Sequence, residues 1–170
     1  PFPETIATTK LYDTFKASQS AAKFVQTLGE GKFYIVNHLG HANNTYVFRM
    51  NASIIGNLPN LPGFFYSQGC YPNNPDTNNW TIQATRAAVG PAAMISNTRY
   101  GWYQPGKGNE GPSALLHRAF WSMLFKDNVR HIGTMNHRAK EMVVAVQRSS
   151  IIRYTALESN LIGDPELDLN

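Results

Sequence analysis

The sequence predicts an α/β protein built on a layered, largely parallel sheet, and three observations support this fold class. Short apolar runs, which are typical of buried strands, alternate along the chain with segments of helical spacing. Hydrophobic residues make up 42% of the 170 residues and charged residues only 15%, so the chain can bury a substantial core. No internal repeat divides it, and its length fits one domain, 1–170, better than two.

The first predicted elements are a helix and two strands. Residues 10–28 predict a helix because apolar side chains recur near helical spacing and Gly29 follows as a stop. The short apolar runs at 32–37 and 64–67 each predict a buried strand. Residues 80–89 then predict a second helix.

The second half of the chain continues the alternation. Residues 92–96 predict a third strand, and Ser113 is the expected cap of a helix that runs to Phe125. A further helix is expected over about 133–147, and the β-branched run at 151–155 predicts a strand.

Charge and cysteine content exclude several classes of function. Lys and Arg outnumber Asp and Glu by 15 to 11, and they are scattered rather than gathered in a basic stripe, so nucleic acid is not an expected partner. The single cysteine excludes an internal disulfide and zinc sites built on several cysteines. No apolar run is long enough to predict a transmembrane segment. The start of the sequence has neither an initiator methionine nor a visible signal peptide, which favours a processed chain or a fragment.

Two predicted strands each lead into a side chain with catalytic potential. The strand at 32–37 is followed by His38 and His41, and the strand at 64–67 is followed by Cys70. Because parallel strands end at the same edge of a sheet, we expect His41 and Cys70 to lie together there. An imidazole beside a thiol stabilises the thiolate, which is the attacking species in cysteine catalysis. The alternatives are an inert core cysteine and a histidine that is only hydrogen-bonded.

Other chemistries fit the sequence less well. Ser67 does not lie in a Gly-x-Ser-x-Gly elbow, and the glycines between 101 and 111 form no phosphate-binding loop. His38 and His41 lack a third ligand, so no metal site is predicted from them.

The order of these motifs resembles that of the caspase-like cysteine peptidases, and in detail that of the gingipains and their bacterial and archaeal relatives. The resemblance begins near residue 30 and rests on five segments in the right order: Asn37-His38-Leu39-Gly40-His41, Gly69-Cys70, 92–102 with its Arg-Tyr-Gly-Trp turn, 111–120, and the closing Asn-Leu-Ile-Gly-Asp-Pro-Glu-Leu of 160–167. It implies a caspase-like three-layer α/β/α fold with a mostly parallel sheet, and a thiol endopeptidase that hydrolyses peptide bonds. It also implies a secreted, cell-surface or periplasmic protein.

The resemblance assigns roles to individual residues. Cys70 would attack the scissile carbonyl to form a thioester, and His41 would accept the thiol proton and then protonate the leaving amine. The backbone N–H groups of Ala42 and Cys70 would form the oxyanion hole. The family usually has glycine where this chain has Ala42, so the hole survives if Ala42 tolerates the local dihedral angles. His38 is the rival base, disfavoured by its position.

Substrate preference is expected to depend on the segment after the third strand. In gingipains this segment lines the primary pocket, and here it runs from Trp102 to Glu110. A carboxylate in the pocket would select Arg or Lys before the cleaved bond, and Glu110 is the only acidic residue in the segment. The alternatives are a solvated loop carboxylate near Lys107 for Glu110 and a core position for Trp102.

Three rival functions stay open on the sequence. They are a catalytically silent caspase-like scaffold, a related transpeptidase or sortase of a secretion system, and a small-molecule hydrolase with a Cys–His pair. No cofactor is expected to be required; the resemblance leaves room for a structural calcium ion whose ligands the sequence does not identify.

The group that orients the histidine is missing from the predicted site. In gingipains this acid lies well upstream, whereas the acids before His41 are Glu4, Asp13 and Glu30, none at the matching position. We therefore expect the chain to be the carboxy-terminal half of a catalytic domain. Its partners would be a protein or peptide substrate and an amino-terminal segment of the same precursor, either left out or on a separate chain.

Overall fold

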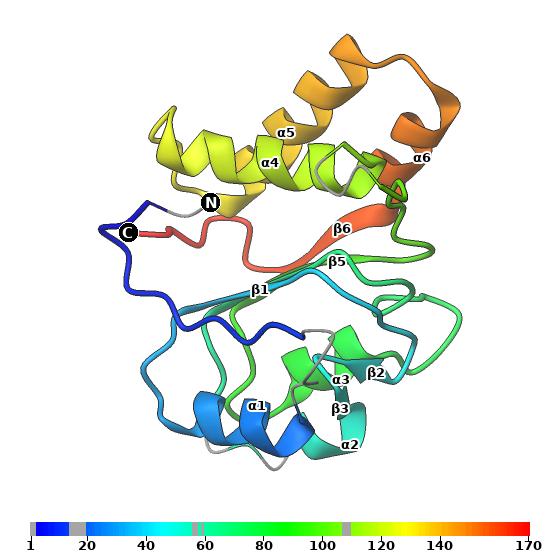
Figure 1. Cartoon of the computed structure of the whole chain (residues 1–170). Helices are drawn as coiled ribbons and strands as arrows, with labels where there is room; N and C mark the ends of the chain where they lie inside the picture. Colours follow the sequence, from blue (N-terminus) through cyan, green and yellow to red (C-terminus); the bar gives the residue numbers. More distant parts are fainter. Residues whose placement is uncertain (1–2, 14–19, 56–57, 59, 107–109) are drawn as a thin grey trace.

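The computed structural model describes residues 3–13, 20–55, 58, 60–106 and 110–170, and its centre is a four-stranded sheet (Figure 1). The strands lie in the order β1-β4-β5-β6. The first three are parallel and β6 is antiparallel to β5, which confirms the mostly parallel sheet. Their bounds are β1 Ile35–His38, β4 Phe64–Ser67, β5 Ala93–Asn97 and β6 Ser159–Gly163.

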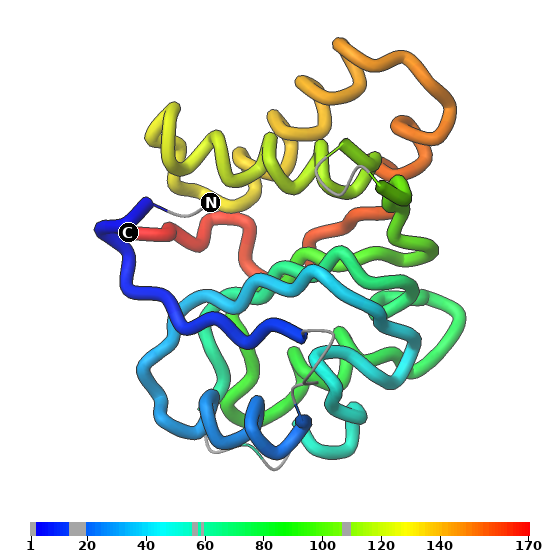
Figure 2. The backbone as a smooth tube through the Cα atoms, in the orientation of Figure 1, coloured from blue at the N-terminus to red at the C-terminus, as the bar shows by residue number. Residues whose placement is uncertain are grey.

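Helices cover both faces of this sheet and produce three layers (Figures 1 and 2). One face carries α4 (Pro112–Phe125), α5 (Ile132–Val146) and α6 (Ser150–Glu158). The other carries α1 (Ala21–Gly29), α2 (Ala52–Ile55) and α3 (Trp80–Arg86). A small hairpin of β2 (Tyr46–Val47) and β3 (Met50–Asn51) precedes α2. This arrangement is the expected caspase-like α/β/α architecture.

The alternation of side chains along β4 builds one core on each side of the sheet. Phe64 and Tyr66 pack into the cluster formed by α4, α5 and α6, whereas Phe65 packs into the cluster formed by α1, α2 and α3. All three are almost fully buried. Burial of each such side chain contributes roughly 1.5–3 kcal/mol, so a one-residue shift in register is strongly disfavoured.

The structure corrects three of the predicted elements. Residues 151–155 belong to helix α6, because Ser149 caps the segment and Ile152 packs into the α4–α5 core. The first helix begins only after Ser20, its cap; residues 10–13 are not helical, and 14–19 lie outside the described residues. The cap of α4 is Gly111, not Ser113.

The remaining predicted strands and helices are confirmed with shifted ends, except β4, whose ends agree. No helix among the described residues is both long and apolar enough to cross a membrane.

Candidate active site

The turns that carry His41 and Cys70 leave neighbouring strands at the same edge of the sheet. His38 and Ser67 are register partners at the ends of β1 and β4, and the Gln68 N–H donates to the His38 carbonyl at 3.1 Å. Gly69 then packs on the other turn: a Cβ added to Gly69 would lie 2.3 Å from the Ala42 Cβ and 3.1 Å from the Gly40 oxygen. The residues on both sides of His41 therefore contact the residue that precedes Cys70.

The Cys70 thiol lies against the backbone of Gly101, in the turn after β5. The Gly101 N–H points to the Cys70 Sγ at 3.4 Å, and the Gly101 oxygen lies 3.8 Å from the same sulfur. An N–H donor stabilises a thiolate. Only glycine fits here, because a Cβ on Gly101 would lie 2.0 Å from the Gln68 oxygen. Cys70 is half-buried and free, as a nucleophile requires.

Asn97, which the sequence reasoning missed, holds the turn before Cys70. Its Nδ2 donates to the carbonyls of Gln68 at 3.2 Å and Gly69 at 3.0 Å. On the other side of the nucleophile, the Tyr71 N–H donates to the Arg99 oxygen at 2.7 Å. Tyr71 has a φ of 64°, a strained value for a residue with a side chain. The feature of the sequence that could have indicated this role is a polar residue, Asn97, at the end of an apolar strand.

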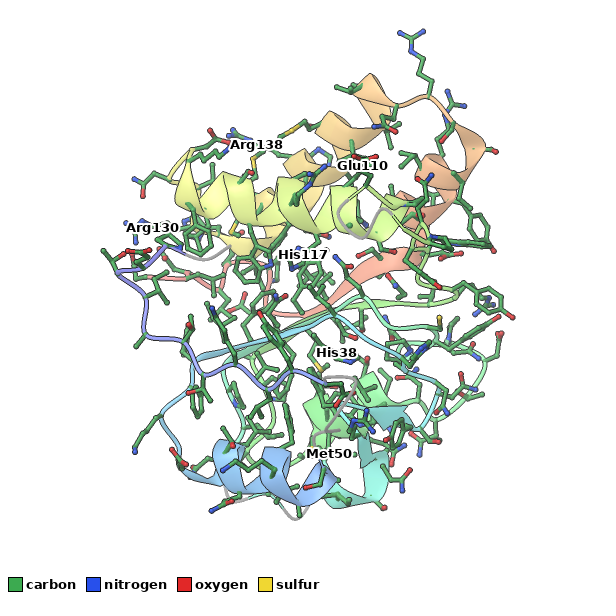
Figure 3. The ribbon with its side chains drawn as sticks, viewed as in Figure 1. His38, Met50, Glu110, His117, Arg130 and Arg138 are labelled. Atoms are coloured by element: carbon green, nitrogen blue, oxygen red, sulfur yellow. The ribbon has the colours of Figure 1, made fainter. Side chains whose placement is uncertain are left out.

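The two histidines of the first turn lie in different environments. The His38 ring (labelled in Figure 3) is largely buried, with Nδ1 2.9 Å from the Ser67 Oγ and the ring tilted by 53° against that of Phe48. Burial, together with the nearby charge of His41, lowers the pKa of His38 from 6.5 to about 4, so its imidazole is neutral at pH 7. His41 is exposed to solvent. Of the two, His41 is the one that can exchange protons with solvent and substrate.

The predicted oxyanion donors lie on the two turns that meet at Gly69. Among the described residues, the N–H groups of Ala42 and Cys70 make no backbone hydrogen bond. Ala42 does not have a positive φ, so the alanine is accommodated at this position without backbone strain. Both donors are therefore available to a ligand.

The predicted pocket residues lie on either side of the segment 103–109. Trp102 is half-buried; its N–H donates to the Ser113 Oγ at 2.9 Å, and its indole Nε1 is buried without a hydrogen-bond partner among the described residues. Glu110 is exposed just before α4 (Figure 3). Because 107–109 lie outside the described residues, including Lys107, the pocket between Trp102 and Glu110 stays a prediction.

A polar pocket of about 420 Å³ reaches Tyr71, the residue after Cys70. It offers neutral hydrogen-bonding groups and is lined by Asn43, Asn44, Thr45, Tyr71, Asn74 and Tyr100. Within the described part of the chain, no three His, Cys, Asp or Glu side chains are grouped to hold a metal ion.

Comparison with known proteins identifies the family. The chain matches the family model described as Peptidase family C25 over residues 2–170. No curated protein and no solved structure matches the chain. The match spans both turns of the candidate site and all of the strands that position them. The protein belongs to peptidase family C25, the gingipain family of cysteine peptidases.

Proposed function

We propose that the protein is a cysteine endopeptidase in which Cys70 is the nucleophile and His41 the general base. The observation that carries this proposal is the packing of the His41 turn on Gly69, together with the Gly101 N–H aimed at the Cys70 sulfur. These contacts gather a thiol, an exposed imidazole and backbone N–H donors at one edge of the sheet. This is the set of groups that acyl transfer to a thiol requires.

The reaction proceeds in two halves. The Cys70 sulfur attacks the scissile carbonyl while its proton passes to His41, and the oxyanion accepts hydrogen bonds from the Ala42 and Cys70 N–H groups. The C–N bond breaks as His41 returns the proton to the leaving amine, which leaves a thioester on Cys70. Water, deprotonated by His41, then hydrolyses the thioester and regenerates the thiol.

Two of the three acids that precede His41 already have cationic partners. Asp13 is paired with Arg49, and Glu30 lies 3.6 Å from Lys32. We propose that the orienting group belongs to an amino-terminal segment of the same precursor, as the family resemblance implies. Substrate selection would follow from Trp102 and Glu110, with Arg or Lys before the cleaved bond, and the protein would act outside the cytoplasm.

The two catalytic residues are tested by substitution in the precursor or the assembled complex. Cys70→Ala is expected to abolish hydrolysis of a peptide library and labelling by a peptidyl acyloxymethyl ketone, with an unchanged circular dichroism spectrum. His41→Ala should lower kcat by about 10³-fold or more, whereas His38→Ala should lower it much less. Activity retained in Cys70→Ala, or a larger loss in His38→Ala than in His41→Ala, contradicts the assignment.

The rival functions give different results in the same assay. A silent scaffold leaves Cys70 unlabelled in the wild type. A transpeptidase forms the same thioester but transfers the acyl group to an added amine in preference to water, which mass spectrometry of the products distinguishes. A peptide-library profile without Arg or Lys at the cleaved bond, or one unchanged in Glu110→Gln, would exclude Glu110 from the primary pocket.

A further inference from the structure

His38 and Ser67 form a hydrogen-bonded pair beneath the two catalytic turns. They are register partners at the ends of β1 and β4, and their Nδ1 and Oγ atoms lie 2.9 Å apart. Ser67 is 1% exposed, and its Oγ also accepts the Gly69 N–H at 3.2 Å. Among the described residues, Nδ1 is the one acceptor within reach of the buried Ser67 hydroxyl, so we assign the hydroxyl as the donor and place the proton of the His38 ring on Nε2.

The other side of the His38 ring supports the turn that carries His41. A Cβ added to Gly40 would lie 2.8 Å from the His38 Nε2, so the backbone of Gly40 rests directly on the imidazole. Phe48, whose centroid is 4.6 Å from that of the ring, fills the space beside it. One imidazole therefore contacts the turn before His41 at Gly40 and, through Ser67, the turn before Cys70 at Gly69.

This arrangement depends on a neutral ring. Burial is the larger cause of the lowered pKa of His38 and the electrostatic effect of His41 the smaller, and both disfavour a charged ring. A neutral imidazole has one acceptor nitrogen, and the Ser67 hydroxyl occupies it. His38 therefore has no free base to offer a substrate, although it lies three residues from His41.

We propose that His38 is a positioning residue which, through Ser67, fixes the turn bearing Cys70 against the turn bearing His41. The proposal rests on the proposed function, because it assumes that these turns carry the nucleophile and the base. The Gly69 N–H, which donates to the Ser67 Oγ, directly precedes the N–H of Cys70 in the chain. Loss of the anchor misdirects the Cys70 N–H and sulfur without removing any substrate contact, so kcat should fall while KM changes little.

The test uses Ser67→Ala, His38→Leu and His38→Asn in the assembled enzyme. Ser67→Ala and His38→Leu should each lower kcat by about 10- to 100-fold, the range expected for losing a buried hydrogen bond. KM should stay within about threefold. His38→Asn should recover most of kcat because its Oδ1 replaces Nδ1 as acceptor. The matched control is Ser96→Ala. It removes a buried hydrogen bond between the hydroxyls of Ser96 and Thr81, which lie 2.8 Å apart and outside the two turns.

A second readout follows the thiol itself. The pH profile of Cys70 alkylation by iodoacetamide should move to higher pH in Ser67→Ala and His38→Leu, and stay unchanged in Ser96→Ala. If folded Ser67→Ala keeps wild-type kcat and the wild-type profile, or if His38→Asn is as impaired as His38→Leu, the positioning role is wrong. Ser67→Ala decides the matter even if His38→Leu does not fold. Absence of all peptide hydrolysis in the wild type would contradict the proposed function, while the alkylation profile would still report on positioning.

Discussion

Asn97 contributes to the site without being part of the Cys–His pair. It is 3% exposed, and one Nδ2 group serves the two consecutive carbonyls of Gln68 and Gly69. Its own carbonyl accepts the Asn73 N–H at 3.1 Å. The side-chain amide and the backbone carbonyl of Asn97 thus tie the end of β5 to the chain on both sides of Cys70. The bond to Gly69 is buried and that to Gln68 only partly so, and leaving the buried carbonyl unpaired costs roughly 1–3 kcal/mol.

We predict that Asn97→Ala lowers both activity and stability. The freed carbonyls allow the turn before Cys70 to move, so kcat should fall by at least about tenfold, with a loss of 1–3 kcal/mol in the free energy of unfolding. Asn160→Ala is the matched control, because the Asn160 Nδ2 also serves two carbonyls, those of Leu157 and Glu158, away from the nucleophile. Steady-state kinetics and urea denaturation measure both effects. Equal losses of kcat in the two variants would refute the specific role of Asn97.

Glu158 is a buried carboxyl that should make stability depend on pH. It is 3% exposed, and neither carboxyl oxygen has a hydrogen-bond partner among the described residues. Burial, partly opposed by Arg99, raises its pKa from 4.5 to about 7. Between pH 4.5 and 7 the folded state holds a proton that the unfolded state has released. Stability supplied by this group is therefore present at low pH and falls, by up to about 1.4 kcal/mol per pH unit, as pH rises.

We predict that Glu158→Gln raises the free energy of unfolding, relative to the wild type, more at pH 8 than at pH 4. The amide mimics the protonated carboxyl, so the difference in unfolding free energy between variant and wild type should grow by about 1–3 kcal/mol across that range. Glu141 is exposed and serves as the control, because the difference in unfolding free energy between Glu141→Gln and the wild type should be the same at both pH values. Urea denaturation at the two pH values measures it. An equal difference at both pH values would show that Glu158 ionises normally.

At the scale of elements, the site depends on how closely two turns approach each other. The turn after β1 and the turn after β4 meet at Gly69 and Ala42, where there is no room for a second Cβ. The parallel register of β1 on β4 brings the two turns together, and the Ser67 Oγ holds the Gly69 N–H within that contact. Glycine at 69 is therefore a requirement of close approach, and alanine at 42 is tolerated because Gly69 leaves space for it.

We predict that Gly69→Ala inactivates the enzyme and that Ala42→Gly partly restores it. The new Cβ would lie 2.3 Å from the Ala42 Cβ, and deleting that methyl leaves contacts of 3.1 and 3.2 Å with the Gly40 oxygen and Ala42 nitrogen. Gly29→Ala, whose added Cβ meets nothing within 4 Å, is the control and should leave kcat unchanged. A double-mutant cycle on kcat measures the coupling. Strict additivity of the two substitutions would show that the turns do not touch as described.

At the scale of the whole molecule, the sheet separates two hydrophobic cores and carries the site at one edge. β1 is an outer strand, and its neighbour among the described strands is β4 alone. An outer strand of this kind can accept a further strand. Two buried histidines, His38 and His117, lie on opposite sides of this sheet, near Phe48 and Tyr66 respectively.

We predict that mild acid destabilises the fold mainly through these histidines. Burial lowers the pKa of both from 6.5 to about 4, so between those values the unfolded state binds protons that the folded state excludes. Stability therefore falls as pH drops from 6.5 to 4, by up to about 1.4 kcal/mol per pH unit for each histidine, and Glu158 offsets one of them. His117→Gln should remove much of the net pH dependence, whereas exposed His137→Gln should not. The test measures urea denaturation midpoints of the wild type and both variants from pH 7 to pH 5. If the midpoint of His117→Gln falls with pH as steeply as that of the wild type, His117 is not a source of the acid destabilisation.

The sequence by itself determined the sheet and the types of residue at its edge. The strand at 64–67 was predicted with its correct ends because Phe-Phe-Tyr packs on both faces, and an apolar run of that length reports burial directly. The placement of Cys70 and His41 after parallel strands followed from topology alone.

Only the tertiary structure decided that 151–155 is helical, since packing of Ile152 on α4 and α5 outweighs the strand preference of a short β-branched run. The sequence favoured His41 over His38 by position, but only the tertiary structure gave the physical difference between them, because the ionisation of a histidine depends on burial and hydrogen bonds contributed by distant segments such as Ser67 and Phe48. The role of Asn97 was hidden for the same reason: its partners are 28 and 29 residues away, and local pattern carries no record of them.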